Sequence, residues 1–523
     1  MKRCTKCGEA YADKTLKFCR NDGSVLQDID TEAATVMFGS NAAATAETIR
    51  DSRHRRRPPK SKAIDSIAVL PFENAGSDPN AEYLSDGITE NIINNLSQLP
   101  KLKVMARSTV FRYKGERIDP QRIADELGVR AVVTGRVQQM GDRLTVGIEL
   151  VDAADGSQLW GERYARQMTD IFELQDEISE QISTRLKLKL TKSQKKHLAK
   201  QYPKESEAYE LYLRGRYFLN KRTASDANKG IECFRQALNI DSNFSLAYAG
   251  LADCQTLLGD VGVQALPPNE AFSQAHQSAT RALELDGSLA EARGTLGHIS
   301  MHLFDWRRAE TELRNAIELN PNYAQTWLWY AYYFAFTGDW PRSFETIQRA
   351  LELDPLSLPV NTSIGELLHF AGRLDDSIEQ FQKVIELDAY KPMPRLEMGR
   401  AFETRREFSL AIAEFTKGRE LSGDSPESLA SLAHCYAVSG QPNEARSLLS
   451  KLDELTKTKY VSSYDMALIH AALDEPEDAI EWLNRGCDFH DGWMIYVTVD
   501  PRWKPLHNDS QFRDIVQRVG LSV

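Results

Sequence analysis

The 523-residue sequence predicts a multidomain protein with three kinds of structure: a small metal knuckle, an α/β domain with a mixed sheet, and an all-α array of repeated helix pairs. Three observations predict it. A cysteine pair followed by a third cysteine lies in the first nineteen residues, strand and helix patterns alternate after it, and a turn then recurs every 34 residues. The expected boundaries are 1–28 for the knuckle, 29–62 for a flexible basic linker, 63–192 for the α/β domain, 206–493 for the array and 494–523 for a C-terminal capping segment.

The composition narrows the class of protein. With 42% hydrophobic residues the chain can build ample core, and its net charge of -11 argues against a general nucleic-acid binder. The sequence has no apolar run long enough for a transmembrane helix and no apolar segment of signal-peptide type near residue 1. The four cysteines beyond residue 19 stand singly in apolar sequence, which does not indicate a disulfide framework. We therefore expect a cytoplasmic protein.

The opening stretch MKRCTKCGEAYADKTLKFCRNDG predicts a zinc site. Cys4 and Cys7 form a C-x-x-C pair, Cys19 begins a second pair, and Asp22 stands where a fourth cysteine would complete it. The segment resembles a zinc ribbon, in which such pairs hold Zn²⁺ tetrahedrally, and a carboxylate is also an acceptable ligand. The resemblance implies Cys4, Cys7, Cys19 and Asp22 as ligands. The alternative is a degenerate ribbon that has lost its metal.

Residues 63–192 predict the order β-α-β-α-β-β-β-α. The run Ile67–Phe72 has the pattern of a buried strand, Pro120 begins a helix that stops at Gly128, and residues 130–164 alternate in the manner of a three-stranded meander. SIAVLPFEN, EYLSDGITENIINNLS, VMARSTVFRYKG, IADELGVRAVVTGRVQ and QLWGERYARQMTDIFELQDEI together resemble the TolB-like domain, related to FlgO and CsgG-type modules of bacteria. The resemblance implies no catalytic role.

Three polar residues of this domain, Asp86, Glu90 and Arg107, are the groups available for chemistry if the domain were an enzyme of unrecognised type. Their expected role is helix capping and surface solvation.

The region from residue 206 onward is built from repeats. The turns ELDGS, ELNPN, ELDPL, ELDAY and ELSGD begin 34 residues apart, at Glu284, Glu318, Glu352, Glu386 and Glu420. Small residues recur at the eighth position of each unit, where they let two helices approach closely: Gly297, Ala331, Gly365, Gly399 and Ala433. The pattern resembles the tetratricopeptide repeat, and we count eight units.

The resemblance implies a superhelix with a concave groove that binds protein or peptide partners. The ninth position of each repeat would point into this groove, which gives His298, Tyr332, Glu366, Arg400 and His434. The alternative is an ordinary solvated surface.

No phosphate loop, kinase, hydrolase or metalloprotease signature occurs in the sequence. We therefore expect a non-enzymatic scaffold or adaptor that binds protein partners through the groove, in bacterial signalling or regulation. The alternative is a nucleic-acid-linked transcriptional regulator that uses the zinc knuckle and the basic run RHRRRPPK of the linker. That basic run is otherwise a solvated charge run.

Overall fold

A computed structural model describes the backbone of strand residues 2–4, 10–11 and 26–28, and residues 64–76, 81–99, 101–116, 119–186, 203 and 205–522. The chain divides into two compact units, Met1–Lys62 and Ala63–Val523. The first unit contains the strands β1 (Lys2–Cys4), β2 (Ala10–Tyr11) and β3 (Leu26–Asp28), which pair antiparallel in the order β2-β1-β3.

Of the four predicted zinc ligands, only the backbone of Cys4 lies in a described strand, β1. Cys7, Cys19, Asp22 and the linker 29–62 lie outside the described residues. The zinc site therefore stays a prediction.

The second unit begins with a mixed sheet, as predicted. Its strands run in the order β6-β4-β7-β8-β9, and β5 also pairs with β7. Their bounds are β4 Ser66–Val69, β5 Glu73–Asn74, β6 Lys103–Val104, β7 Ala131–Met140, β8 Arg143–Asp152 and β9 Ser157–Gln167. The strand β4 is parallel to β6 and β7, whereas β7, β8 and β9 form the antiparallel meander. The central strand β4 is almost wholly apolar because it is buried on both faces.

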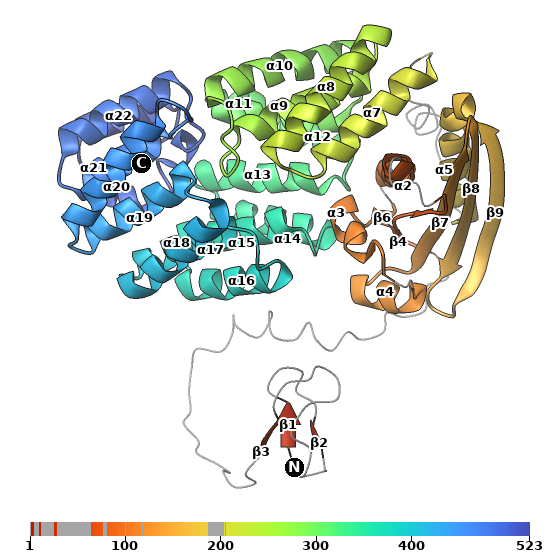
Figure 1. The fold of residues 1–523 in the computed structure, drawn as a ribbon, viewed down its shortest axis with the longest axis horizontal. Helices are drawn as coiled ribbons and strands as arrows, with labels where there is room; N and C mark the ends of the chain where they lie inside the picture. The colour runs from red at the N-terminus through yellow and green to blue at the C-terminus, as the bar shows by residue number, and fades with distance from the viewer. Residues whose placement is uncertain are drawn as a thin grey trace. The chain divides into compact units, whose positions relative to one another are not determined.

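Four helices accompany the sheet: α2 (Glu82–Ser97), α3 (Arg107–Val110), α4 (Pro120–Leu127) and α5 (Ile171–Arg185), with 3-10 turns η3 (Phe111–Tyr113) and η4 (Met168–Asp170). The bounds of α4 follow from local chemistry. Asp119 accepts hydrogen bonds from the backbone of Gln121 and Arg122, and Gly128 ends the helix with a φ of 62°. Figure 1 shows α2 between the sheet and the helical array. This helix is therefore buried nearly all round.

Sixteen helices form the array, and consecutive helices pack in pairs (Figure 1). Their bounds are α7 Ser206–Leu219, α8 Ala224–Ile240, α9 Ser245–Gly259, α10 Pro268–Leu285, α11 Ala290–His302, α12 Trp306–Leu319, α13 Ala324–Phe336, α14 Trp340–Leu353, α15 Leu358–Phe370, α16 Leu374–Leu387, α17 Met393–Thr404, α18 Phe408–Ser422, α19 Pro426–Val438, α20 Pro442–Leu455, α21 Ser463–Ala472 and α22 Pro476–Asp488. The small residues act as predicted: a Cβ on Gly399 would lie 2.6 Å from the ring of Phe415, and one on Gly297 would lie 2.7 Å from Leu313.

The C-terminal segment does more than cap the last repeat. It contains η5 (Met494–Tyr496), η6 (Pro501–Leu506) and α23 (Ser510–Arg518), and α23 packs against α22 as a cap would. It also reaches back to the α11–α12 pair, where Trp306 Nε1 donates to the carbonyl of Val519 at 2.6 Å and His490 Nδ1 lies 3.1 Å from the carbonyl oxygen of His302. The array is thus joined to itself across about 200 residues of sequence.

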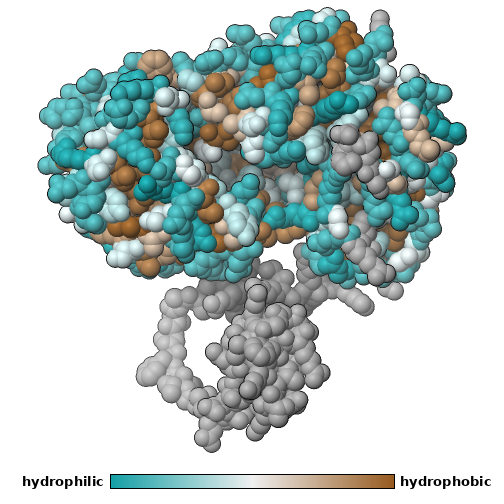
Figure 2. Space-filling view, in the orientation of Figure 1, coloured by the Kyte–Doolittle hydropathy of each residue, from teal (hydrophilic) through white to brown (hydrophobic). Residues whose placement is uncertain are grey.

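Polar residues cover most of the face shown in Figure 2, with apolar residues in scattered groups among them. Among the described helices, none combines the length and the apolar character that crossing a membrane requires.

Candidate functional site

The five predicted groove residues all lie on the inner helices of the array, but they are not an accessible track. Four of them are between 3% and 9% exposed, and Glu366 is half-buried. Each has a partner within the chain. His298 Nε2 lies 2.9 Å from Asp260, the Tyr332 hydroxyl donates to Glu366, Arg400 pairs with Glu397 and Glu427, and His434 Nδ1 lies 2.9 Å from Glu403.

The chain's own C-terminal segment covers these side chains. The Tyr496 ring lies 4.8 Å from the ring of Phe336, and the Arg400 guanidinium stacks 4.7 Å above Trp493. Since Trp493 and Tyr496 are themselves buried, this part of the inner face is core. A role of the five residues as partner contacts stays a prediction, and the described contacts give them internal partners first.

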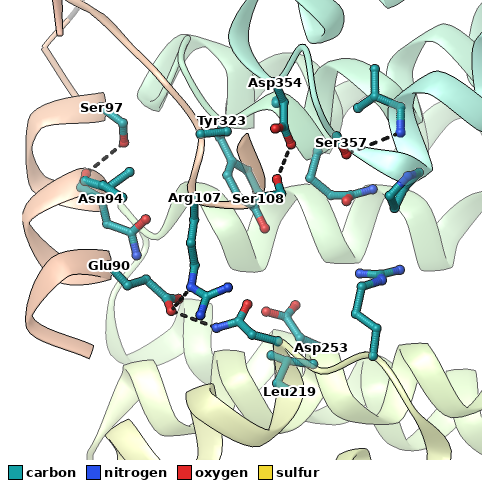
Figure 3. Close-up of a pocket in the computed structure, with 18 of the residues that line it drawn as sticks. Glu90, Asn94, Ser97, Arg107, Ser108, Leu219, Asp253, Tyr323, Asp354 and Ser357 are labelled. Atoms are coloured by element: carbon teal, nitrogen blue, oxygen red, sulfur yellow. Dashed lines mark hydrogen bonds and ion pairs between the residues drawn. The ribbon is translucent and has the colours of Figure 1, made fainter. Parts of the chain in front are cut away.

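An open cavity of about 240 Å³ lies at the junction between the α/β domain and the array. One wall comes from α2 and α3, and the other walls come from α7, α9 and the starts of α13 and α15 (Figure 3). Its lining includes charged groups of both signs and two rings, those of Tyr323 and Trp329.

Turns of successive repeats grip the α/β domain beside this cavity. The Asn322 amide donates to the carbonyls of Ser97 (2.8 Å) and Leu102 (2.9 Å). One repeat later, Asp354 accepts a 2.7 Å hydrogen bond from Thr109, and one repeat beyond that Arg112 donates to the carbonyl of Leu387. The 34-residue period therefore places an equivalent turn every repeat along the edge of the α/β domain.

Glu90 is the centre of the charged cluster in the cavity wall. Its carboxylate lies 3.0 Å from Arg107 Nε and accepts hydrogen bonds from Arg216 Nε (2.9 Å) and Asn220 (2.7 Å). Burial favours the neutral acid, but Arg216 and Arg107 outweigh it and hold the pKa of Glu90 below its usual value. This carboxylate therefore stays ionised at neutral pH and ties α2 to α3 and α7.

Asp253 on α9 has the opposite balance. Burial raises its pKa to about 6, although Arg216, 3.5 Å from Oδ2, and the Thr295 hydroxyl, 2.6 Å from Oδ1, both favour the charged form. The cavity wall thus holds an acid whose protonation changes just below neutral pH.

The expectation for Asp86, Glu90 and Arg107 was wrong. Asp86 and Glu90 are 4% and 6% exposed, and Asp86 forms a 2.6 Å ion pair with Lys114. Neither caps a helix or faces bulk solvent, because the array covers this side of α2. One signal was available in the sequence: Asp86 and Glu90 are four residues apart, so they share a face of α2.

The comparisons with known proteins divide the chain in the same way. Residues 62–193 match the family model of the second domain of HilA/YgeH-like transcriptional regulators. Residues 304–357 and 358–391 each match a tetratricopeptide repeat model. The helical region consists of tetratricopeptide repeats. The TolB-like resemblance is not confirmed by these matches.

Among curated proteins, the chain is 35% identical over 263 residues to a putative adenylate cyclase 3 of Rhizobium meliloti, a match that covers 50% of this chain and 43% of that protein. It is 30% identical over 90 residues to the transcriptional regulator HilA of Salmonella typhimurium, covering 17% of this chain and 16% of HilA. The chain therefore spans less than half the length of these relatives.

Among solved structures, a tetratricopeptide repeat protein of Parabacteroides merdae matches 52% of this chain and all of its own, with 14% identity and a TM-score of 0.38. Pseudomonas aeruginosa PilF matches 44% of this chain and 98% of its own, with 20% identity and a TM-score of 0.32. Scores this low carry no functional argument.

Proposed function

We propose that the chain is a non-enzymatic regulatory scaffold that receives a protein partner at the junction cavity. Tetratricopeptide repeats indicate a protein-interaction scaffold. The observation that supports the cavity is its position: residues 493–503 fill the inner face near α13 and α15, whereas the face toward α2 and α3 retains about 240 Å³ of open space.

The lining of the cavity suits a short polar segment of a partner. Tyr323, Gln325 and Trp329 on α13 and the turn before it are half-exposed, so their polar atoms are accessible. Arg222, at the edge of the cavity, is exposed and adds a cation. A volume of this size holds one or two side chains, and the surrounding charges would orient them.

A photo-crosslinking amino acid at Gln325 tests the proposal in the full chain. We expect a discrete adduct with a protein from native lysate at Gln325 and none at Glu379, an exposed position on α16 that serves as the matched control. The adduct should disappear when Trp329 is changed to alanine. Adducts at Glu379 but not at Gln325 would place the partner elsewhere on the array.

The match to a putative adenylate cyclase does not lead us to propose a cyclase. It covers 43% of that protein, and we propose that the shared part is regulatory. The purified chain should form no cyclic AMP from ATP in the presence of Mg²⁺ or Mn²⁺. Turnover that survives repeated purification and is lost on mutation of Glu90 would overturn this assignment.

A second candidate function is regulation of transcription, which the match of residues 62–193 to a domain of HilA/YgeH-like regulators favours. The basic run in residues 53–62 would then contact DNA. Binding of a labelled duplex should weaken steeply with salt and be lost when residues 1–62, a separate compact unit, are removed. Equal binding without these residues would exclude this role for the basic run.

We also propose that Cys4, Cys7, Cys19 and Asp22 hold one zinc ion, on the strength of their spacing. Elemental analysis of the purified chain and of Asp22→Ala tests it. Zinc that is retained in full by Asp22→Ala would remove Asp22 from the ligand set.

A further inference from the structure

Two histidines and an aspartate converge at the end of α9. Asp260 directly follows α9, and His298 and His302 lie on α11. One ligand-type atom from each residue lies within 4.8 Å of the other two. The sequence HISMH spaces the histidines by four residues, so the two rings share one face of the helix. The sequence analysis assigned His298 to the groove and did not connect it with His302.

The ion pair between His298 and Asp260 accounts for only part of this cluster. Asp260 Oδ1 lies 2.9 Å from His298 Nε2. His302 is 2% exposed, and its Nδ1 has no hydrogen-bond partner among the described residues; the same is true of His298 Nδ1. A buried polar nitrogen without a partner costs free energy, and in native proteins it asks for an explanation.

The rings around the cluster hold it in place. The His298 ring stacks on Trp329, with centroids 4.7 Å apart and planes at 13°. The His302 ring stacks on Phe272, with centroids 4.5 Å apart and planes at 22°. Gly259, just before Asp260, packs so closely that a Cβ there would lie 2.7 Å from Ala271. Ligands that are fixed in this way lose little freedom when they bind an ion.

We propose that Asp260, His298 and His302 form a binding site for a divalent transition-metal ion, for which Zn²⁺ is the best fit. Two imidazole nitrogens and one carboxylate oxygen are a zinc donor set with an open coordination position. Asp260 also lines the junction cavity, so the ion lies at the edge of the space where the partner would bind. The ion would join the second repeat to the third and add positive charge beside Asp253.

The test must separate this site from the predicted knuckle. We would use the full chain with Cys4→Ser and Cys7→Ser, stripped by a chelator, and titrate it with Zn²⁺ and with Co²⁺. The expected result is one ion per chain, with a Co²⁺ spectrum that shows weak visible bands and no thiolate charge-transfer band. Absence of binding at micromolar Zn²⁺ in this background would overturn the proposal.

The ligands are tested by His302→Gln, with His276→Gln on the neighbouring helix α10 as the matched control. Zn²⁺ affinity should fall at least tenfold in the first variant and stay unchanged in the second. If His302→Gln does not fold, as judged by circular dichroism, Asp260→Asn decides, because it keeps the size of the half-buried side chain. Unchanged affinity in Asp260→Asn would overturn the proposal.

Discussion

Replacing Asp253 with asparagine should stabilise the protein at neutral pH and leave its stability unchanged in acid. Asp253 is buried in the cavity wall, and its pKa is raised from 3.8 to about 6. A carboxyl with a raised folded-state pKa binds its proton more tightly in the folded chain than in the unfolded chain. Its favourable contribution is therefore present below pH 3.8 and is lost as the pH rises through about 6.

The size of the effect follows from the shift in pKa. A difference of about two pH units corresponds to about 3 kcal/mol, since each unit is worth about 1.4 kcal/mol. Asparagine has nearly the same shape and can still accept from the Thr295 hydroxyl, but it carries no charge to bury. Above pH 7 the variant should therefore be more stable than the wild type by about 2–3 kcal/mol.

The assay is urea unfolding of both proteins at pH 4, 6 and 8, with the difference in unfolding free energy taken at each pH. Groups that titrate in both proteins cancel in this difference. Asp142→Asn, in the exposed turn between β7 and β8, is the matched control and should change stability by less than about 0.5 kcal/mol at every pH. A difference for Asp253→Asn that does not grow with pH would refute the reasoning.

Three further predictions concern the junction and the array. Glu90→Gln should lower the unfolding free energy by about 3–5 kcal/mol at pH 7, because two buried arginines lose their counter-charge; the difference should shrink below pH 4.5, where the wild-type carboxylate takes up its proton. Gly399→Ala places a Cβ 2.6 Å from a buried ring and should cost about 1–3 kcal/mol in thermal unfolding, whereas Gly287→Ala, with no atom nearer than 3.7 Å, should cost far less. Asn322→Ala leaves two carbonyls of the α/β domain without their donors, so hydrogen exchange in α2 should accelerate; protection equal to the wild type would show that the junction does not depend on this amide.

Local periodicity was enough to predict most of the elements. The element order of the α/β domain follows from alternating and helical patterns, and the 34-residue spacing locates each repeat turn. The close approach at Gly297 and Gly399 follows as well, because small residues recur at one position of every unit. These features depend on neighbours in sequence or on a strict repeat.

The candidate site depends on contacts that no local pattern contains. Glu90 meets Arg216 across 126 residues, and Asn322 meets Ser97 across 225. Polar residues at these positions have the pattern of a solvated face when the partner is unknown. The same holds for the inner face of the array: the ninth position does point inward, as at Arg400, but nothing local shows that residues near Trp493 would cover it.

The link between Trp306 and Val519 has a consequence for how the molecule is made. A repeat array usually folds progressively, because each unit needs only its neighbours. Here the third repeat keeps buried surface unsatisfied until a segment 213 residues later has left the ribosome. Such distant contacts slow the last step of folding, so the nascent chain exposes Trp306 and its surroundings for most of its synthesis. Chaperone capture during translation should therefore concentrate on that stretch, and release should wait for residues 490–519.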